Sequence, residues 1–373
     1  MTRALALAAA LLLAAPAAAL AQWSAPTSLT GDVAAAFGPQ ALTTSRGDRV
    51  VTYGLGGELR WSRAYPGQDA PWHREFSSSP VGARLLTYAS RSLLIVNRTE
   101  GRLPWELHAR FGAFGAGFRG SERRIAPGED VLTYAPAVDA RGDAVVAYVQ
   151  NVRRGTVVLR RVVRVVTRPA GGSLGRPRTI AGSGSPTAVG AAVGAGGEIV
   201  VAYERQGRLL VRRREPGHAW LAPQDLGAAV KGHTQIDVAA SAGGMFAVAW
   251  FAQELTEGGD NGPAAVCLAV RNAGGHRFHA ARTFETFAQR APQGAAVRVA
   301  LASDGTGVLG WTGRQGDHFV ARVADLTGTT GTTVSDPTAA MRTPDSVCAV
   351  RPRAVRRPSV NPTADGLVKT AQP

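Results

Sequence analysis

Residues 137–149 read AVDARGDAVVAYV, and the pattern returns as AVGAGGEIVVAYE at 192–204, VAASAGGMFAVAWF at 238–251 and VALASDGTGVLGWT at 299–312. Each copy is an apolar segment, a glycine turn and a second apolar segment with Tyr or Trp six residues after the glycine. Glycine supplies the positive φ that tight hairpin turns require. The pattern therefore predicts two antiparallel strands in each copy.

Two further copies and two further strands complete the repeat. Gly47 and Tyr53 mark one copy, while a degenerate copy at 90–96 lacks both the glycine and the aromatic and is placed by spacing. An arginine-rich third strand and a fourth strand follow, as in RLLVRRRE at 208–215 and WLAPQDLG at 220–227. Four strands recurring every ~45–60 residues are typical of a propeller blade. We predict an all-β fold, a six-bladed β-propeller of four-stranded antiparallel blades whose ring is closed by the N-terminal strand. Seven blades would require the C-terminal tail to form most of a blade.

Small side chains mark the first strand of the repeat. Leu42, Ala137, Ala192, Ala239 and Ala300 fall at equivalent places when the aromatics are aligned. The innermost strands of a propeller crowd around an axis, so small side chains are expected there. A β-sandwich would not require them at one strand per repeat, and the pattern therefore favours a radial arrangement.

The ring needs a closing strand. The segment QWSAPTSLTGD at 22–32 reads like the fourth strand AWLAPQDLGAA at 219–229, and it precedes the first full repeat. The sixth repeat has only a weak fourth strand, GTTGTTVSD at 328–336. We expect the N-terminal strand to replace or flank that segment and to close the ring.

The ends of the chain predict export. One arginine, an apolar run from Ala4 to Ala15 and the triplet 19–21 are typical of a secretory signal peptide cleaved before Gln22. The run is shorter than the roughly 20 apolar residues that span a bilayer. We expect a secreted, extracellular protein.

The predicted domain organisation is a signal peptide at 1–21, the propeller at 22–337 and a mostly disordered tail rich in Pro and Arg at 338–373.

The charge of the chain limits the kinds of partner that can be expected. Formal net charge is +15, and only Lys231 and Lys369 among the 42 basic residues are lysines. A basic surface can attract nucleic acid, anionic wall polymers or acidic polysaccharide. The arginines are spread over all repeats, which favours a compositional bias and makes nucleic acid an unexpected partner.

The chain contains two cysteines, Cys267 and Cys348. In an oxidising compartment such a pair is expected to form a disulfide, which would tie the tail to the fifth repeat. The alternative is a pair of unbonded buried thiols.

The repeats resemble secreted β-propeller repeat proteins of actinobacteria, distantly sialidase-like or WD40-like. In these proteins an Ala-x-Asp-x-x-Gly turn, here 137–142, precedes an apolar strand that ends in Tyr or Trp. The resemblance covers roughly 22–336 and implies the architecture without an activity. Ser303-Asp304-Gly305, with Trp311 further on, departs from the sialidase turn spacing, so no catalytic residue is assigned.

Candidate ligand-binding residues come from propeller geometry, because propellers bind at loops that join the second strand to the third and the fourth to the next first strand. The longest such loop is AQELTEGGDNGPA at 252–264. Its carboxylates could hold Ca²⁺, but a solvated loop is favoured, and no other cofactor or metal is expected. For His276 and His279 a polar turn is likewise favoured over a metal site. The predicted ligand-binding residues are Gln40, Arg153, Arg154, Asp237, Glu254, Glu257, Asp260 and Arg298.

These observations predict an exported, non-catalytic binding or scaffold propeller, monomeric, with a cell-envelope polymer or a protein as partner. The alternative is a sialidase-like hydrolase acting on glycans through acidic residues of the loop face. A hydrolase should bring two carboxylates within roughly 5–10 Å of each other at the channel mouth. A structural envelope protein is the third hypothesis, preferred if neither feature is found.

Overall fold

The computed structural model describes strands and turns over most of the predicted propeller, and no helix occurs in the part it describes. The described backbone comprises residues 36–43, 49–55, 58–64, 72–76, 80–88, 92–99, 106–113, 123–126, 129–182, 184–229, 236–255, 261–288, 296–315, 318–326 and 348. Side chains are described for residues 84, 86, 88, 106–111, 123–126, 129–182, 184–229, 236–253, 263–288, 296–313, 320–326 and 348.

The strands of the described chain form six antiparallel sheets in sequence order. The first three are β1(Ala36–Thr43), β2(Arg49–Leu55), β3(Glu58–Ala64) and β4(Trp72–Phe76); β5(Pro80–Tyr88), β6(Ser92–Thr99), β7(Leu107–Ala113) and β8(Arg123–Arg124); and β9(Asp130–Val138), β10(Ala144–Arg154), β11(Val157–Arg168) and β12(Arg178–Ala181). The last three are β13(Val189–Val193), β14(Ile199–Arg205), β15(Arg208–Arg214) and β16(Gln224–Ala228); β17(Ile236–Ala240), β18(Phe246–Leu255), β19(Asn261–Arg271) and β20(Arg282–Phe287); and β21(Val297–Leu301), β22(Gly307–Gln315) and β23(His318–Leu326).

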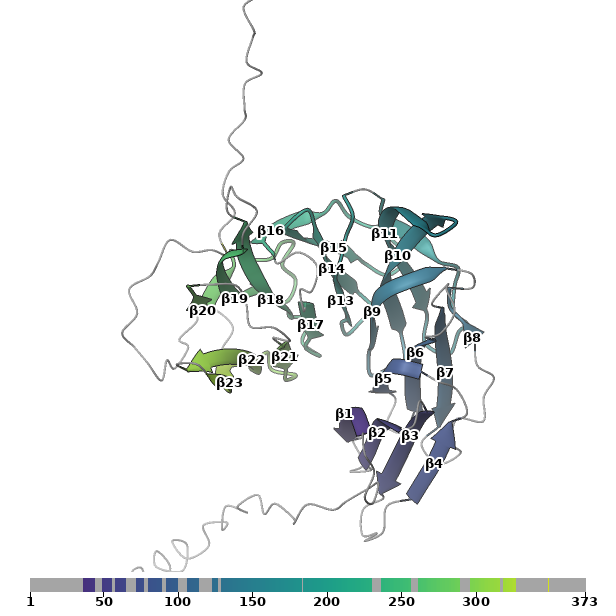
Figure 1. Ribbon diagram of the computed structural model, residues 1–373. Helices are drawn as coiled ribbons and strands as arrows, with labels where there is room; N and C mark the ends of the chain where they lie inside the picture. Colours follow the sequence, from purple (N-terminus) through teal and green to yellow (C-terminus); the bar gives the residue numbers. More distant parts are fainter. Residues whose placement is uncertain are drawn as a thin grey trace, which may run out of the picture.

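The six sheets are arranged around an axis, with the first strand of each sheet innermost (Figure 1). Contacts link these strands in succession: β1 with β5, β5 with β9, β9 with β13, β13 with β17, and β17 with β21. Four-stranded meanders that meet through their first strands define a β-propeller. The predicted all-β propeller fold is confirmed, and the degenerate second repeat does form a sheet, β5–β8. A total of six blades stays a prediction.

The sixth sheet has three described strands, β21, β22 and β23. The two segments predicted to supply its outer strand, 22–32 and 328–336, lie outside the described residues, so ring closure by the N-terminal strand stays a prediction. The predicted signal peptide at 1–21 and, apart from Cys348, the tail at 338–373 also lie outside them. Among the described residues no helix is long and apolar enough to span a membrane.

Side-chain hydrogen bonds explain the turn between the first and second strands. The Asp139 carboxylate accepts hydrogen bonds from the backbone N–H groups of Arg141, Gly142 and Asp143, at 2.9–3.0 Å. Ser241 caps the equivalent turn of the fifth sheet, where its hydroxyl accepts the Met245 N–H at 3.0 Å. Short polar side chains favour such turns because they satisfy nearby backbone donors. The repeated turn pattern is therefore a local structural requirement.

The small residues of the first strand occupy one register position, as predicted. Leu42, Ala137, Ala192, Ala239 and Ala300 pair with Val50, Val145, Val200, Ala247 and Val308 respectively. Gly190 shows how closely the inner strands approach one another. A Cβ at Gly190 would lie 2.9 Å from methyl carbons of Ile236 and Val238 on β17.

The aromatic of the second strand is buried between sheets in the third, fourth and fifth repeats. Tyr148, Tyr203 and Trp250 are buried, and the indole N–H of Trp250 donates to the Ala228 carbonyl of the preceding sheet at 2.8 Å. Burying a large aromatic with its polar atom satisfied stabilises such an interface. The apolar core is thus divided into clusters between neighbouring sheets.

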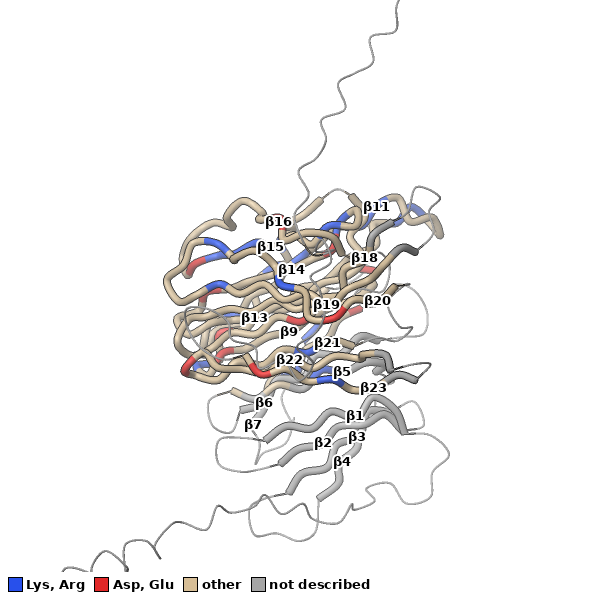
Figure 2. The backbone as a smooth tube through the Cα atoms, turned by 90° about the vertical axis from the view of Figure 1, so that its left-hand side faces the viewer, with Lys and Arg blue, Asp and Glu red and all other residues tan. Residues whose placement is uncertain are grey.

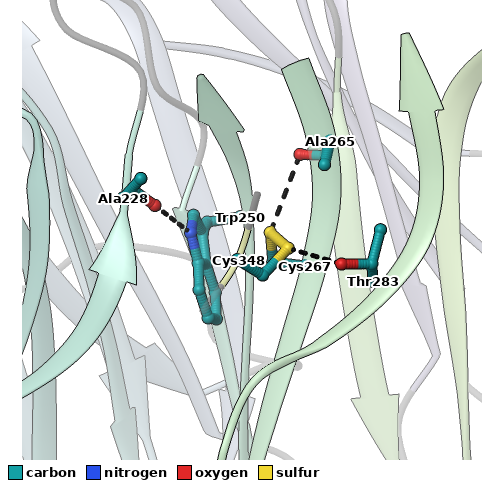
Figure 3. Close-up of a disulfide and its surroundings, with 6 residues drawn as sticks. All are labelled: Ala228, Trp250, Ala265, Cys267, Thr283 and Cys348. Atoms are coloured by element: carbon teal, nitrogen blue, oxygen red, sulfur yellow. Dashed lines mark hydrogen bonds between the residues drawn. A yellow bond between two sulfur atoms is a disulfide. The ribbon is translucent and has the colours of Figure 1, made fainter. Parts of the chain in front are cut away.

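A disulfide joins Cys267 on β19 to Cys348, with 6.0 Å between their Cα atoms (Figure 3). Both cysteines are buried in the core cluster between the fourth and fifth sheets, near Trp250. The Thr283 hydroxyl donates to the Cys348 Sγ at 3.1 Å. The disulfide therefore holds a residue of the C-terminal segment inside the propeller core.

Candidate functional site

Five of the eight predicted ligand-binding residues lie in strands near the axis or at a strand end. Asp237 and Arg298 lie on the innermost strands β17 and β21, and Arg153 and Arg154 end β10. Gln40 lies on the innermost strand β1, and its side chain is outside the described part.

The other three predicted residues are the carboxylates of the loop at 252–264. Glu254 belongs to β18, but its side chain is not among those described. Glu257 and Asp260 lie outside the described residues. The preference for a solvated loop over a calcium site therefore stays a prediction.

Three predicted residues on innermost strands, hereafter the axial residues, share one register position of the repeat: Gln40, Asp237 and Arg298. Gln40 pairs with Thr52, Asp237 with Ala249 and Arg298 with Gly310, and each partner precedes the aromatic of its repeat. Arg84 on β5 occupies the same place in the second sheet, where it pairs with Val96. Arg84 was not among the predicted residues, because the second repeat lacks the glycine and the aromatic by which the other repeats align.

The remaining inner strands carry small residues at this position. Ala135 on β9 pairs with Ala147, and Gly190 on β13 pairs with Ala202. At this position of the first strand, the fifth, sixth, first and second sheets therefore carry a polar or charged residue. The third and fourth sheets carry a small residue there.

Asp237 is the carboxylate of this axial set. Its Oδ2 accepts the backbone N–H of Val299 on the neighbouring strand β21 at 2.8 Å. Burial raises the pKa of Asp237, while the Val299 hydrogen bond and the positive charges of Arg298 and Arg84 partly oppose that shift. Arg84 thus acts electrostatically on Asp237 from a sheet that is not adjacent to it.

Arg153 and Arg154 differ in their surroundings. The guanidinium of Arg153 pairs with the buried carboxylate of Asp130 and also donates to the Thr156 carbonyl at 2.9 Å. Asp130 in turn accepts the Asn151 side-chain amide at 3.0 Å. Arg153 is therefore paired with a buried carboxylate of its own sheet, whereas Arg154 is exposed at the tip of the β10–β11 hairpin.

A recess of about 390 Å³ lies between the fourth and fifth sheets. It is formed by turns that join the first strand to the second and the third to the fourth, on the face opposite the loops favoured in the sequence analysis. Its lining residues are Ala195, Gly196, Glu198, Arg213, Glu215, Pro216, His218, Gly244, Arg271, Gly274, Gly275 and His276.

An ion-pair network runs across this recess from one sheet to the next. Glu198 of the fourth sheet pairs with Arg271 of the fifth at 2.6 Å and with Arg213 at 3.3 Å. Arg271 is 2% exposed, stacks over the ring of Phe246 at 4.7 Å and donates to the Gly275 carbonyl at 2.6 Å. A buried guanidinium needs such partners because its desolvation is costly.

The outer part of the recess is more accessible. Glu215 lies 3.5 Å from the same Arg213 nitrogen that contacts Glu198. A second guanidinium nitrogen of Arg213 lies 3.4 Å from the Nδ1 of His276, and His218 is exposed at the edge. The outer part of the recess thus offers two imidazoles, one carboxylate and one guanidinium to a ligand.

His276 and His279 lie on the connection between β19 and β20. Of the two, His276 lines the recess, and His279 does not. No group of three His, Cys, Asp or Glu side chains suited to a metal ion occurs in the part of the chain that the structure describes.

Comparison with known proteins gives similarity in structure alone. No family model and no curated protein sequence matches the chain. An ulvan lyase superposes with a TM-score of 0.48 and 11% identity, covering 77% of this chain and 78% of that one. A Penicillium chrysogenum α-L-arabinanase superposes with a TM-score of 0.44 and 12% identity, covering 77% of this chain and 92% of that one. An Aleuria aurantia lectin superposes with a TM-score of 0.44 and 12% identity, covering 79% of this chain and 93% of that one.

Proposed function

We propose that the chain is an exported binding module whose recess between the fourth and fifth sheets takes a sugar unit of a cell-envelope polymer. The observation that carries the proposal is the recess itself, lined by guanidinium, carboxylate and imidazole groups from two adjacent sheets. Its volume of about 390 Å³ lies in the lower part of the range of small-ligand sites.

The chemistry of the lining favours a ligand rich in hydroxyl groups. A hydroxyl both donates and accepts hydrogen bonds, so it can bridge an arginine donor and a carboxylate acceptor. Arg213 and Glu215 offer this combination 3.5 Å apart. The four glycines of the lining carry no side chain, so a sugar ring can approach the backbone closely. Two arginines and two glutamates balance in charge, which argues against a polyanion as the ligand of this recess.

The disulfide supports the exported location. Cys267 and Cys348 are bonded, and structural disulfides persist in oxidising compartments. Together with the signal-like N-terminal segment, this favours a protein that works outside the cytoplasm, where envelope polymers are available.

Glycan hydrolysis is the weaker candidate for this recess. Glu198 and Glu215 both contact one nitrogen of Arg213, at 3.3 and 3.5 Å. The guanidinium thus sits against both carboxylates, where a glycosidase would hold the scissile bond or a water molecule. The recess also lies on the face opposite the loops that were expected to carry the acidic residues of a hydrolase.

The test is a binding titration of the exported form against immobilised envelope polysaccharides and a panel of neutral oligosaccharides. Glu215→Gln and His276→Ala each remove an accessible recess group, and we expect each to weaken binding about tenfold or more, as for loss of a charge-assisted hydrogen bond. His279→Ala is the matched control, because His279 is similarly exposed, lies three residues from His276 and is not part of the lining.

Unchanged melting temperatures in all three variants would show that the recess variants are folded. Equal affinities of wild type, Glu215→Gln and His276→Ala for every saccharide would exclude this recess as the site. Release of reducing ends from any polymer in the panel would instead favour the hydrolase.

A further inference from the structure

The outer edge of β11 is only partly covered by its own sheet. β11 runs for 12 residues from Val157 to Arg168, whereas β12 has 4 residues and pairs only with Val163, Arg164 and Val165. Between residues 157 and 162, hereafter the β11 edge, no described strand pairs on the side away from β10. No described backbone group outside the ladders bonds to it either.

The side chains of the β11 edge are unusually apolar for an exposed strand. Val157 is 61% exposed, Leu159 60% and Val158 38%. Natural proteins normally cover or charge such edges, because unpaired N–H and C=O groups beside apolar side chains invite another strand to pair. An apolar, unpaired edge is therefore a binding surface for an extended chain.

Charge selects the kind of chain that the β11 edge can accept. Arg154 and Arg160 are exposed and have no hydrogen bond or ion pair within the described part of the chain, whereas Arg161 donates to the Asn151 side chain at 3.1 Å. The hairpin segment 151–162 contains no Asp or Glu. Two unpaired positive charges beside apolar side chains match an extended segment that carries acidic and apolar residues.

The same charges disfavour two other occupants. A second copy of this edge would bring arginine against arginine, and like charges opposite each other destabilise a strand pair. The C-terminal segment 349–373 contains five basic residues and a single acidic one, Asp365, so it is repelled as well.

We propose that the β11 edge binds an acidic, extended segment of another protein by strand addition. Main-chain hydrogen bonds to the edge would supply affinity, and Arg154 and Arg160 would select acidic side chains. This site is separate from the recess between the fourth and fifth sheets, and a saccharide bound there does not compete with it.

Backbone geometry identifies a residue that tests the main-chain bonds. Arg154 and Val157 close a two-residue turn in which Gly155 has a φ of 61°. The pair that closes such a turn is hydrogen-bonded, so the next residue, Val158, directs its N–H away from β10. Val158→Pro removes that donor at an edge position where proline is tolerated.

The experiment uses fluorescent peptides and the full chain. One short peptide alternates valine and glutamate, and its control alternates valine and lysine. We expect the glutamate peptide to bind the wild type at least tenfold more tightly than the lysine peptide. Val158→Pro should weaken that binding about tenfold, and Arg160→Glu should reverse the preference between the two peptides. Leu221→Glu, at an exposed leucine of the β15–β16 connection, is the control and should bind as the wild type does.

Hydrogen exchange separates strand addition from other contacts. Binding of the glutamate peptide should slow exchange at the amides of the β11 edge about tenfold or more. Equal binding of the two peptides, or binding without added protection at 158–162, overturns the proposal. Binding of anionic phospholipid vesicles that Val158→Pro leaves unchanged, with no peptide selectivity, would assign the hairpin to a membrane surface instead and also overturn it.

Discussion

At the scale of single residues, the propeller places charged groups in two environments with opposite electrostatic consequences. Asp237 near the axis is mostly withdrawn from water, and burial raises its pKa. Asp304 is an exposed turn residue whose pKa is lowered by hydrogen bonds from the hydroxyl and the backbone N–H of Thr306. The two aspartates should therefore contribute to the stability of the fold with opposite dependence on pH.

We expect Asp237→Asn to raise the melting temperature at neutral pH. Because the folded-state pKa of Asp237 lies above its unfolded value, its contribution to folding is full below the unfolded pKa and is lost as pH rises through the folded pKa. A neutral Asn does not ionise, so the variant does not lose this contribution to the free energy of folding as pH rises. The gain over wild type should vanish below about pH 4, where the aspartate is protonated in both states.

Asp304→Asn should behave in the opposite way. A lowered folded-state pKa contributes stability above the unfolded pKa and loses it as pH falls through the folded pKa, so the Asn variant should be the less stable protein at neutral pH. Melting curves of both variants from about pH 3 to about pH 8 check the signs. Parallel curves for Asp237→Asn and wild type over this range would contradict the environment assigned to Asp237.

At the scale of elements, the close contact between inner strands depends on missing side chains. β13 and β17 approach so closely that a Cβ at Gly190 would lie 2.9 Å from two methyl carbons and 3.0 Å from the Ile236 carbonyl oxygen. The oxygen belongs to the backbone, which moves less readily than a side chain. The register therefore requires glycine at this position of the fourth sheet.

We expect Gly190→Ala to lower the free energy of unfolding by about 1–3 kcal/mol, as for an overpacked core. Gly182→Ala is the control, since a Cβ at Gly182 would have no atom within 4 Å and its backbone is outside the left-handed region. Chemical denaturation of the two variants measures the difference. A Gly190→Ala variant as stable as wild type would contradict the strand separation described between β13 and β17.

At the scale of the whole molecule, the disulfide links parts of the chain that lie 81 residues apart and places Cys348 between the fourth and fifth sheets. The pair thus joins the C-terminal segment to the interface that also forms the recess. Closing a long loop restricts the unfolded chain more than it restricts the folded one.

Replacing both cysteines by alanine should lower the free energy of unfolding by about 2–4 kcal/mol. Reduction of the wild type should lower the melting temperature similarly, and reduction of the double variant should have no further effect. A melting temperature insensitive to both changes would contradict a bonded, core-forming pair. Saccharide binding measured on the same samples shows whether the recess needs this constraint.

The sequence by itself determined the all-β class, the repeated hairpin and the equivalence of the axial positions Gln40, Asp237 and Arg298. These features follow from local chemistry, because a turn such as that at Asp139 and the alternation of strands are set by neighbouring residues. Arg84 could not be assigned to the same axial position from the sequence, because its repeat lacks the turn glycine and the aromatic. The spacing of the second repeat was nevertheless sufficient to predict its sheet.

Only the tertiary structure decided what lies between the sheets. Glu198 and Arg271 are 73 residues apart in the sequence and form an ion pair across the interface of the fourth and fifth sheets. They line a recess on the face opposite the one whose long loop predicted ligand binding. Likewise, the uncovered edge of β11 depends on where β12 stops pairing. Repeats fix the sheets one at a time, but side chains from adjacent sheets meet only once their rotation about the axis and their register are set. That long-range geometry is not encoded in any single repeat.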